Sequence, residues 1–163
     1  MLIGILSDSH GDHVMVHRAV ALFDSLGVEH IVHCGDVCGT NVFDELVGRP
    51  CTFVWGNMDD TDPPLMAYLD SVGISPPNSS PVRLNLGGKS FAVFHGHERG
   101  FVDAIESLKV DYILHGHTHV ARDERRGKTR IINPGALYRA KLKTVATLDT
   151  STDELEFVEV SNG

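Results

Sequence analysis

The stretch LIGILSDSH, residues 2–10, joins a continuous apolar run to two potential metal ligands. An apolar run of this kind, without alternating polar residues, predicts a strand that is buried on both faces. Asp8 and His10 follow the run directly. In α/β proteins the carboxyl ends of parallel strands line the crevice in which sites are built. The stretch therefore predicts a central strand and one wall of a functional site.

The chain that follows alternates between helix and strand patterns. Short apolar runs predict strands at residues 30–35 and 51–56. Residues 14–27 place apolar side chains at helical spacing, and residues 41–48 predict a short helix with Asn41 as its cap. A succession of strand, helix, strand, helix and strand is typical of a sheet with parallel strands.

The back half of the chain is richer in strands. A loop rich in Pro and Ser at residues 73–81 precedes it, and a helix is predicted at residues 101–108. The other predicted elements are a strand at 111–116 and hairpins at 82–96, 120–135 and 144–160. Two such halves predict an α/β fold in which two sheets pack together with helices outside.

Length and hydropathy set the broad class of protein. A chain of 163 residues suits one compact domain, residues 1–163, because domains cluster at about 100–150 residues. No apolar run approaches the ~18 residues of a membrane span. The first residues lack the basic and apolar regions of a signal peptide. We therefore expect a cytoplasmic protein with no membrane partner.

Charge and cysteine content exclude further classes. The formal net charge is −8 at pH 7, whereas sequence-independent nucleic-acid binding needs clustered Lys and Arg. The basic cluster at residues 122–130 is expected to be a solvated hairpin turn around Gly127. The three cysteines lack a C-x-x-C pair and are expected to be free thiols. We expect no extended nucleic-acid surface and no disulfide scaffold.

Almost every predicted strand breaks at a glycine or serine that a potential metal ligand follows. The seven candidate ligands are Asp8, His10, Asp36, Asn57, His95, His117 and His119. Carboxylate, imidazole and amide ligands together suit borderline divalent metals such as Mn, Fe, Ni or Zn, and differ from the all-oxygen set of calcium. The glycines allow the backbone to turn sharply and to approach the site without a Cβ in the way.

Each short motif has an ordinary explanation by itself. A helix cap explains Asp8, turns explain the Gly-Asp and Gly-Asn pairs, and a surface cluster explains the histidines of residues 113–120. Five motifs in one order, each at a strand end, are not explained by coincidence. They are DSH at 8–10, GDVCG at 35–39, GNMD at 56–59, HGH at 95–97 and GHTH at 116–119, with NPG at 133–135 after them.

With these motifs the chain resembles the calcineurin-like metallophosphoesterases, and in particular their small single-domain phosphodiesterase branch. The resemblance extends from residue 3 to about residue 149. It implies a four-layer α/β/β/α sandwich, in which helices flank two mixed sheets and a two-metal site lies along one sheet edge. It also implies hydrolysis of a phosphodiester.

The resemblance assigns the seven ligands to two ions, of which Mn is favoured and Fe, Ni or Zn are alternatives. One ion is expected on Asp8, His10, Asp36 and His119, and the other on Asp36, Asn57, His95 and His117. Asp36 would bridge them, because two cations ~3.5–4 Å apart need an anion between them. A hydroxide shared by both ions would attack phosphorus in line.

The remaining polar residues are given lesser roles. His97 is expected to contact the substrate phosphate or to donate a proton, Asn57 to contact substrate, and Arg139 to reach an anionic substrate. His33 and His115 are expected to pack behind the site and to donate to a backbone carbonyl or a carboxylate. Three histidines are expected at the surface: His13, His17 and His30.

Two positions depart from the family pattern. Many relatives have histidine where this chain has Met58, and methionine has no exchangeable proton to give to a leaving group. Relatives often have serine where this chain has Ala136. The first departure favours the phosphodiesterase branch and disfavours alkyl phosphomonoesters, whose leaving groups need a general acid.

Two alternatives to a phosphodiesterase remain open. The first is a phosphomonoesterase that acts on a small metabolite or nucleotide. The second is a protein-binding scaffold on the same fold. The expected partner is a small phosphate-ester substrate. Because relatives often pair through their sheets or loops, a homodimer is compatible with the resemblance.

Overall fold

A computed structural model describes residues 1–161 of the chain, and its first sheet is built around the strand that opens the sequence. This sheet has five strands in the order β10-β9-β1-β2-β3. They are β1 (Leu2–Leu6), β2 (His30–His33), β3 (Cys51–Phe53), β9 (Thr144–Asp149) and β10 (Glu154–Glu159). Strands β1, β2 and β3 are parallel, and β9 is antiparallel to both of its neighbours.

The second sheet also has five strands, in the order β4-β5-β6-β8-β7. They are β4 (Val82–Leu86), β5 (Lys89–Val93), β6 (Tyr112–Leu114), β7 (Arg122–Arg126) and β8 (Thr129–Asn133). Strands β5, β6 and β8 are parallel, whereas the edge strands β4 and β7 are antiparallel to their neighbours. Both sheets are therefore mixed, and each has a parallel centre.

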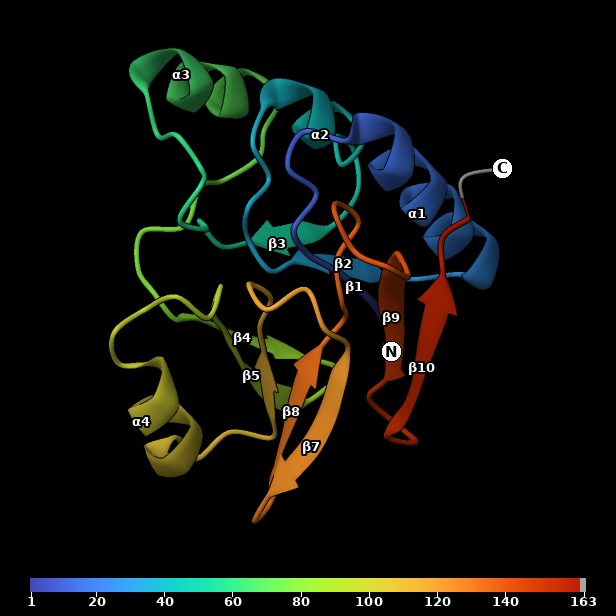
Figure 1. Ribbon diagram of the computed structural model, residues 1–163, viewed down its shortest axis with the longest axis vertical. Helices are drawn as coiled ribbons and strands as arrows, with labels where there is room; N and C mark the ends of the chain where they lie inside the picture. The colour runs from blue at the N-terminus through green and yellow to red at the C-terminus, as the bar shows by residue number, and fades with distance from the viewer. Residues whose placement is uncertain (162–163) are drawn as a thin grey trace.

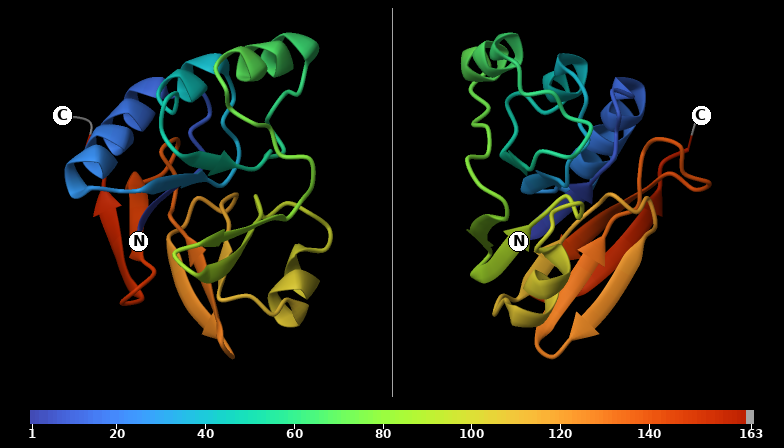
Figure 2. Two further views of the ribbon diagram at one scale, coloured as in Figure 1. Left: turned by 180° about the vertical axis from the view of Figure 1, so that it is seen from behind. Right: turned by 60° about the vertical axis from the view of Figure 1, so that its left-hand side comes forward.

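Helices cover the outer faces of the two stacked sheets. Helices α1 (His13–Leu26), α2 (Thr40–Asp44) and α3 (Pro63–Ser71) lie on the side of the first sheet, and α4 (Phe101–Ser107) lies on the side of the second (Figures 1 and 2). The predicted α/β/β/α sandwich is confirmed. The three predicted hairpins are β4-β5, β7-β8 and β9-β10.

Three apolar clusters separate these layers. The middle cluster joins the two sheets and includes Ile3 and Ile5 of β1. Leu6 faces the cluster under α1, α2 and α3, and a smaller cluster lies under α4. Gly4 lies on the helix side of β1, where an added Cβ would stand 2.8 Å from the Phe23 ring. The continuous apolar run of β1 thus reflects burial on both of its faces.

Two local predictions need correction. Asn41 is not a cap, because Gly39 precedes α2 and Asn41 lies inside the helix. Helix α3 was not expected, although its sequence carries a start signal. Asp62 accepts a hydrogen bond from the Leu65 N–H, and Pro63 occupies the first helical position. Within the described residues, no helix has the length and hydropathy needed to cross a membrane.

Candidate metal centre

The seven candidate ligands converge at one edge of the sandwich, although they come from both sheets. Each lies in the loop that follows a parallel strand: Asp8 and His10 follow β1, Asp36 follows β2, Asn57 follows β3, His95 follows β5, and His117 and His119 follow β6. The carboxyl ends of the parallel strands in both sheets therefore face one common space.

One group within this space consists of Asp8, His10 and His119, whose potential ligand atoms lie within 4.8 Å of one another. Oδ1 of Asp8 lies 3.2 Å from Nε2 of His119. Oδ1 of Asp8 and Nε2 of His10 are both buried, and neither has a hydrogen-bond partner among residues 1–161. Unpaired buried polar atoms are costly in a native fold. A cation between them would satisfy both, so the donor set fits a metal ion.

A second group of potential ligand atoms within 4.8 Å consists of Asp8, Asp36 and His95. Oδ2 of Asp36 lies 3.4 Å from Nε2 of His10 and 3.4 Å from Nε2 of His95. Nε2 of His95 is also 3.1 Å from Oδ1 of Asn57. The Asp36 carboxylate thus lies between a ligand candidate of the first group and one of the second.

His95 and Asp36 are oriented by backbone groups. Nδ1 of His95 lies 2.8 Å from the Cys34 carbonyl, so this nitrogen donates and Nε2 is left facing the site. The Met58 N–H donates to Oδ1 of Asp36 at 2.9 Å. Burial would raise the pKa of Asp36, but the neighbouring His95 ring and the hydrogen bond from the Met58 N–H lower it to about 2. Asp36 is therefore a carboxylate at neutral pH.

The backbone of the site is strained. Five of the candidate ligands have a positive φ angle: Asp8 (53°), His10 (45°), Asp36 (55°), His117 (68°) and His119 (58°). Such conformations cost about 1–3 kcal/mol each and cluster where function over-determines the backbone. The side chains of a regular strand point alternately to its two faces. Because these five residues leave the strand conformation, that alternation does not predict where their side chains point.

Two glycines allow the loops to approach the carboxylates, as the sequence predicts. An added Cβ at Gly56 would stand 2.1 Å from Oδ1 of Asp36. At Gly116 it would stand 1.9 Å from Oγ of Ser7 and 2.6 Å from Oδ2 of Asp8. These distances are far shorter than any real Cβ contact, so both positions require glycine.

Three polar side chains brace the loops and were missed in the sequence. Asp59 accepts hydrogen bonds from the N–H groups of Cys38 and Gly56, and so ties the loop after β2 to the loop after β3. Glu98 accepts from the N–H groups of His95 and Gly96.

The third brace is Asn133. Its amide nitrogen donates to the Gly116 carbonyl at 2.8 Å, and its Oδ1 accepts from the Gly135 N–H. Asp59 and Asn133 belong to the GNMD and NPG motifs, so a signal for two of the three braces was present in the sequence.

A cleft of about 550 Å³ opens onto the candidate ligands. It is lined by His10, Asp36, Cys38, Asn57, Met58, His117, His119, Tyr138 and Arg139. The Tyr138 ring lies 5.2 Å from the His10 ring, and the Arg139 guanidinium lies over Tyr138 at 5.1 Å. Asp8 and His95 are fully buried beneath this opening. Arg139 therefore stands at the mouth of the candidate site.

His97 lies beside the cleft and does not line it. Its ring is 5.3 Å from the His95 ring and 6.2 Å from the His117 ring. Its side chain is 36% exposed, and its Nδ1 lies 3.9 Å from Oε2 of Glu98. The ring is thus within reach of a ligand that protrudes from the cleft.

The other histidines are sorted by burial. His33 and His115 are buried, as expected, and burial lowers the pKa of His33 to about 3 and that of His115 to about 4. The partners of His33 are the Ser9 hydroxyl and the Gly35 N–H, so the expected carbonyl or carboxylate acceptor is wrong for this residue. Nδ1 of His115 faces the Gly116 carbonyl at 3.1 Å.

Of the three histidines expected at the surface, two are exposed and one is not. His13 and His17 are exposed, and His17 pairs with Glu45 at 2.8 Å. His30 is half-buried in β2 against Thr52, and burial lowers its pKa. The contact with Thr52 on the neighbouring strand β3 explains this difference.

The chain is similar to one protein family over nearly its whole length. The model of the calcineurin-like phosphoesterase superfamily domain matches residues 1–153. The chain belongs to this superfamily. The phosphodiesterase MJ0936 of Methanocaldococcus jannaschii is 28% identical over 159 residues, which cover 94% of this chain and 96% of that protein.

Solved structures agree with this family. An archaeal phosphodiesterase superposes with a TM-score of 0.87 at 27% identity, covering 98% of this chain and 99% of the other. The E. coli phosphoesterase YfcE has a TM-score of 0.68 at 22% identity, covering 99% and 100% of the two chains, and shares the fold.

Proposed function

We propose that this protein is a metal-dependent phosphodiesterase that holds two divalent cations with its seven strand-end residues. One observation carries the proposal: Oδ1 of Asp8 and Nε2 of His10 are buried, have no hydrogen-bond partner among residues 1–161, and face the same space as the Asp36 carboxylate. The similarity to phosphodiesterase MJ0936 and to the archaeal phosphodiesterase supports the choice of a diester.

The two ions divide the seven residues between them. One is held by Asp8, His10, Asp36 and His119, and the other by Asp36, Asn57, His95 and His117. When bound, such a pair lowers the pKa of a water molecule for in-line attack on phosphorus. It also offsets the charge that develops on the oxygens of the phosphate. Mn is the favoured ion, with Fe, Ni and Zn as alternatives, because this ligand set accepts several borderline metals.

The chain itself supplies position and charge. Asp36 is ionised, and the Met58 N–H binds its Oδ1, so that its Oδ2 faces both groups of ligands. Asn57 is exposed at the cleft and is available to a substrate oxygen. His97 and Arg139 border the opening and contact the substrate phosphate, with His97 as a candidate proton donor.

Met58 favours diesters whose leaving group needs no protonation. The residue is 61% exposed at the cleft, and its side chain has no exchangeable proton. An alkoxide leaving group needs a general acid, whereas an aryl oxide does not. The dependence on the leaving group should therefore be steep.

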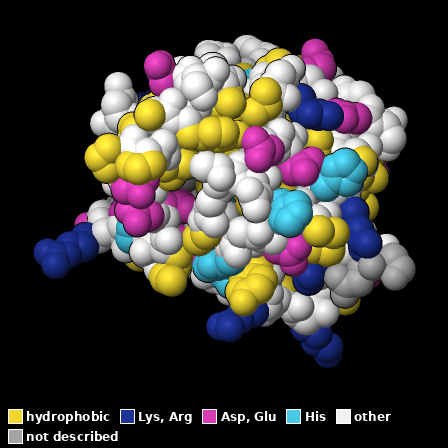
Figure 3. All heavy atoms as spheres, turned by 90° about the horizontal axis from the view of Figure 1, so that it is seen from above, with side chains coloured by type: hydrophobic (Ala, Val, Ile, Leu, Met, Phe, Trp, Pro, Cys, Tyr) yellow, Lys and Arg dark blue, Asp and Glu magenta, His cyan; other side chains and the backbone are white. Residues whose placement is uncertain are grey.

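The surface favours a small substrate over a long nucleic acid. The net charge is −8. On the face covered by α1, α2 and α3, the Lys and Arg side chains stand around the edge and do not gather at the centre (Figure 3). A polyanion requires a continuous basic track, so we assign a small phosphate ester as substrate.

A phosphomonoesterase is the second candidate, and the position of His97 favours it. An ionisable ring beside the cleft, 36% exposed, supplies the general acid that Met58 cannot. This candidate and the phosphodiesterase make opposite predictions for a pair of aryl phosphates.

A paired assay tests both candidates. The protein is loaded with Mn and given bis-p-nitrophenyl phosphate and p-nitrophenyl phosphate at equal concentration. Faster hydrolysis of the diester is expected, and preference for the monoester would favour the second candidate. If no turnover occurs with Mn, Fe, Ni or Zn and no metal is retained on purification, both enzymatic candidates are wrong and a protein-binding role remains.

A further inference from the structure

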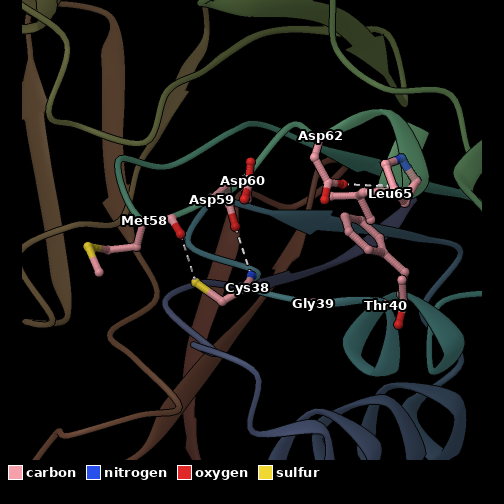
Figure 4. Close-up of a pocket in the computed structure, with 10 residues that line it drawn as sticks. Cys38, Gly39, Thr40, Met58, Asp59, Asp60, Asp62 and Leu65 are labelled. Carbon is pink, nitrogen blue, oxygen red and sulfur yellow. Dashed lines mark hydrogen bonds between the residues drawn. The ribbon is translucent and has the colours of Figure 1, made fainter. Parts of the chain in front are cut away.

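A second cavity adjoins the candidate metal centre. It has a volume of about 450 Å³ and lies between the loops after β2 and β3 and the first turns of α2 and α3 (Figure 4). We call it the side pocket. None of the seven candidate ligands lines it, but Cys38 and Met58 line both the side pocket and the metal cleft. The two hollows therefore share one wall.

The side pocket runs from Met58 at one end to Leu65 at the other (Figure 4). Its apolar lining comes from Phe43, Pro64 and Leu65. These side chains belong to the helical layer. Phe43 is fully buried, and Pro64 and Leu65 are the ones that offer apolar surface to a ligand that extends from the cleft. An apolar wall of this kind stabilises an organic group, because burying it removes apolar surface from water.

Carboxylates supply the polar part of the lining. Asp59, Asp60 and Asp62 line the pocket, and no Lys, Arg or His side chain does so. Asp59 is occupied by the N–H groups of Cys38 and Gly56, and Asp62 by the N–H of Leu65. Within residues 1–161, Asp60 forms no hydrogen bond or ion pair that would neutralise it, and it is exposed.

These observations decide what charge the pocket accepts. A second phosphate in the side pocket, as in a nucleoside polyphosphate or an oligonucleotide, would meet three carboxylates and no Lys, Arg or His side chain. An ammonium group on an apolar body would meet an apolar floor and a free carboxylate at the rim. The carboxylates repel an anionic substituent and attract a cationic one with similar strength. The pocket should therefore both reject a phosphate and favour an ammonium group.

We propose that the side pocket binds one ester arm of the phosphodiester, and that this arm is an apolar body bearing an ammonium group. The proposal rests on the proposed function, because the phosphate of the same molecule lies in the metal cleft. Met58 stands at the junction, where its flexible and apolar side chain contacts the arm near the phosphate.

Three symmetric diesters test the proposal: bis[4-(aminomethyl)phenyl] phosphate, diphenyl phosphate and bis(4-carboxyphenyl) phosphate. Each carries the same group on both arms, so it does not matter which arm enters the pocket. We expect the highest kcat/KM for the ammonium diester and the lowest for the carboxylate diester. The released phenol is measured by chromatography, at low ionic strength to limit screening.

The variant Asp60→Asn identifies the source of the preference. It should reduce the ratio of kcat/KM between the ammonium and carboxylate diesters by about 2- to 5-fold, the range that an exposed ion pair gives. Intrinsic reactivity cancels in this comparison. The matched control Asp70→Asn removes an exposed carboxylate of α3 that does not line the pocket. It should leave the ratio unchanged. An equal ratio in the wild-type protein and Asp60→Asn would overturn the proposal.

A binding measurement separates this proposal from the proposed function. Benzylamine alone is titrated into protein labelled with ¹³C at the methionine methyl groups, and benzoate serves as the anionic control. A saturable shift of the Met58 methyl with benzylamine only, weakened in Asp60→Asn, is expected even if no diester is hydrolysed. Turnover of diesters without this shift and without charge preference would remove the side-pocket proposal and leave the phosphodiesterase proposal intact.

Discussion

The backbone N–H of His117 donates a hydrogen bond to Oδ2 of Asp8 across 3.0 Å. The two residues are 109 positions apart in the sequence, and the bond joins the loop after β1 to the loop after β6. It leaves Oδ1 of Asp8 without a hydrogen bond among residues 1–161 and directed toward Nε2 of His119, which is 3.2 Å away. The close approach of these loops depends on the absence of a side chain at Gly116.

Gly116→Ala should therefore disrupt the centre. Its Cβ would stand 2.6 Å from Oδ2 of Asp8, so the carboxylate or the loop must move. We expect a loss of about 1–3 kcal/mol in the free energy of unfolding, as for other overpacked sites, and weaker Mn binding by calorimetry.

The matched control for this variant is Gly100→Ala. Gly100 has nothing within 4 Å of an added Cβ and does not have a positive φ angle. It should change stability by less than about 0.5 kcal/mol. Equal effects of the two substitutions would show that the close approach at Gly116 is unimportant.

Asp36→Asn should remove both of the proposed ions. The neutral amide cannot offset two cations, and it loses the oxygen that faces both His10 and His95. We expect kcat/KM to fall by more than about 100-fold, beyond the range for outer-sphere partners. Metal content by mass spectrometry should fall in parallel while circular dichroism shows an intact fold. Full activity would refute the bridging role.

Asp59→Asn should weaken metal binding without removing a ligand. An amide keeps one acceptor but loses the other, so either the Cys38 N–H or the Gly56 N–H is left unpaired. We expect metal affinity to fall about 10- to 100-fold and excess Mn to restore kcat. Asp70→Asn, an exposed carboxylate of the neighbouring helix, should behave as the wild-type protein in both measurements. Failure of excess Mn to restore kcat would argue for a direct role in the reaction.

Burial of His33 should make the metal-free fold sensitive to acid. The Gly35 N–H donates to Nδ1 of His33, so the neutral ring carries its proton on Nε2. Burial lowers its pKa from 6.5 to about 3. The unfolded chain therefore binds a proton that the folded chain does not, and the free energy of unfolding falls as the pH drops from 6.5 toward 3.

Urea titrations in the presence of a chelator measure this dependence. His33→Gln removes the titrating ring, so the fall in the free energy of unfolding between pH 6.5 and pH 3 should be shallower than in the wild-type protein. Each pH unit is worth about 1.4 kcal/mol for one fully linked proton. Identical pH profiles for the two proteins would contradict the burial of a neutral ring.

The layers of the fold were predictable because local patterns decide them. The apolar run of β1 is buried on both faces, and Gly27 ends α1 in a left-handed conformation. The order of strand-end ligands predicted where they gather, since parallel strands present their carboxyl ends at one edge.

Long-range contacts account for most of what the sequence did not predict. The GNMD motif marks Asp59, but its role as a brace depends on Cys38, which lies beside it only in the folded chain. The side pocket requires Phe43 and Leu65 to meet across two helices, and His30 is half-buried because β2 packs against β3. None of these pairings leaves a periodic pattern in the chain.

The candidate centre draws Asp8, His10, Asp36 and Asn57 from the loops of one sheet, and His95, His117 and His119 from the loops of the other. An ion bound there would fasten the two halves of the sandwich together. Above its dissociation constant, each tenfold rise in the concentration of one free ion adds about 1.4 kcal/mol to the stability of the fold. A molecule starved of metal would thus be slower to catalyse and also easier for a protease to open, so the supply of the ion would set both the activity and the lifetime of the chain.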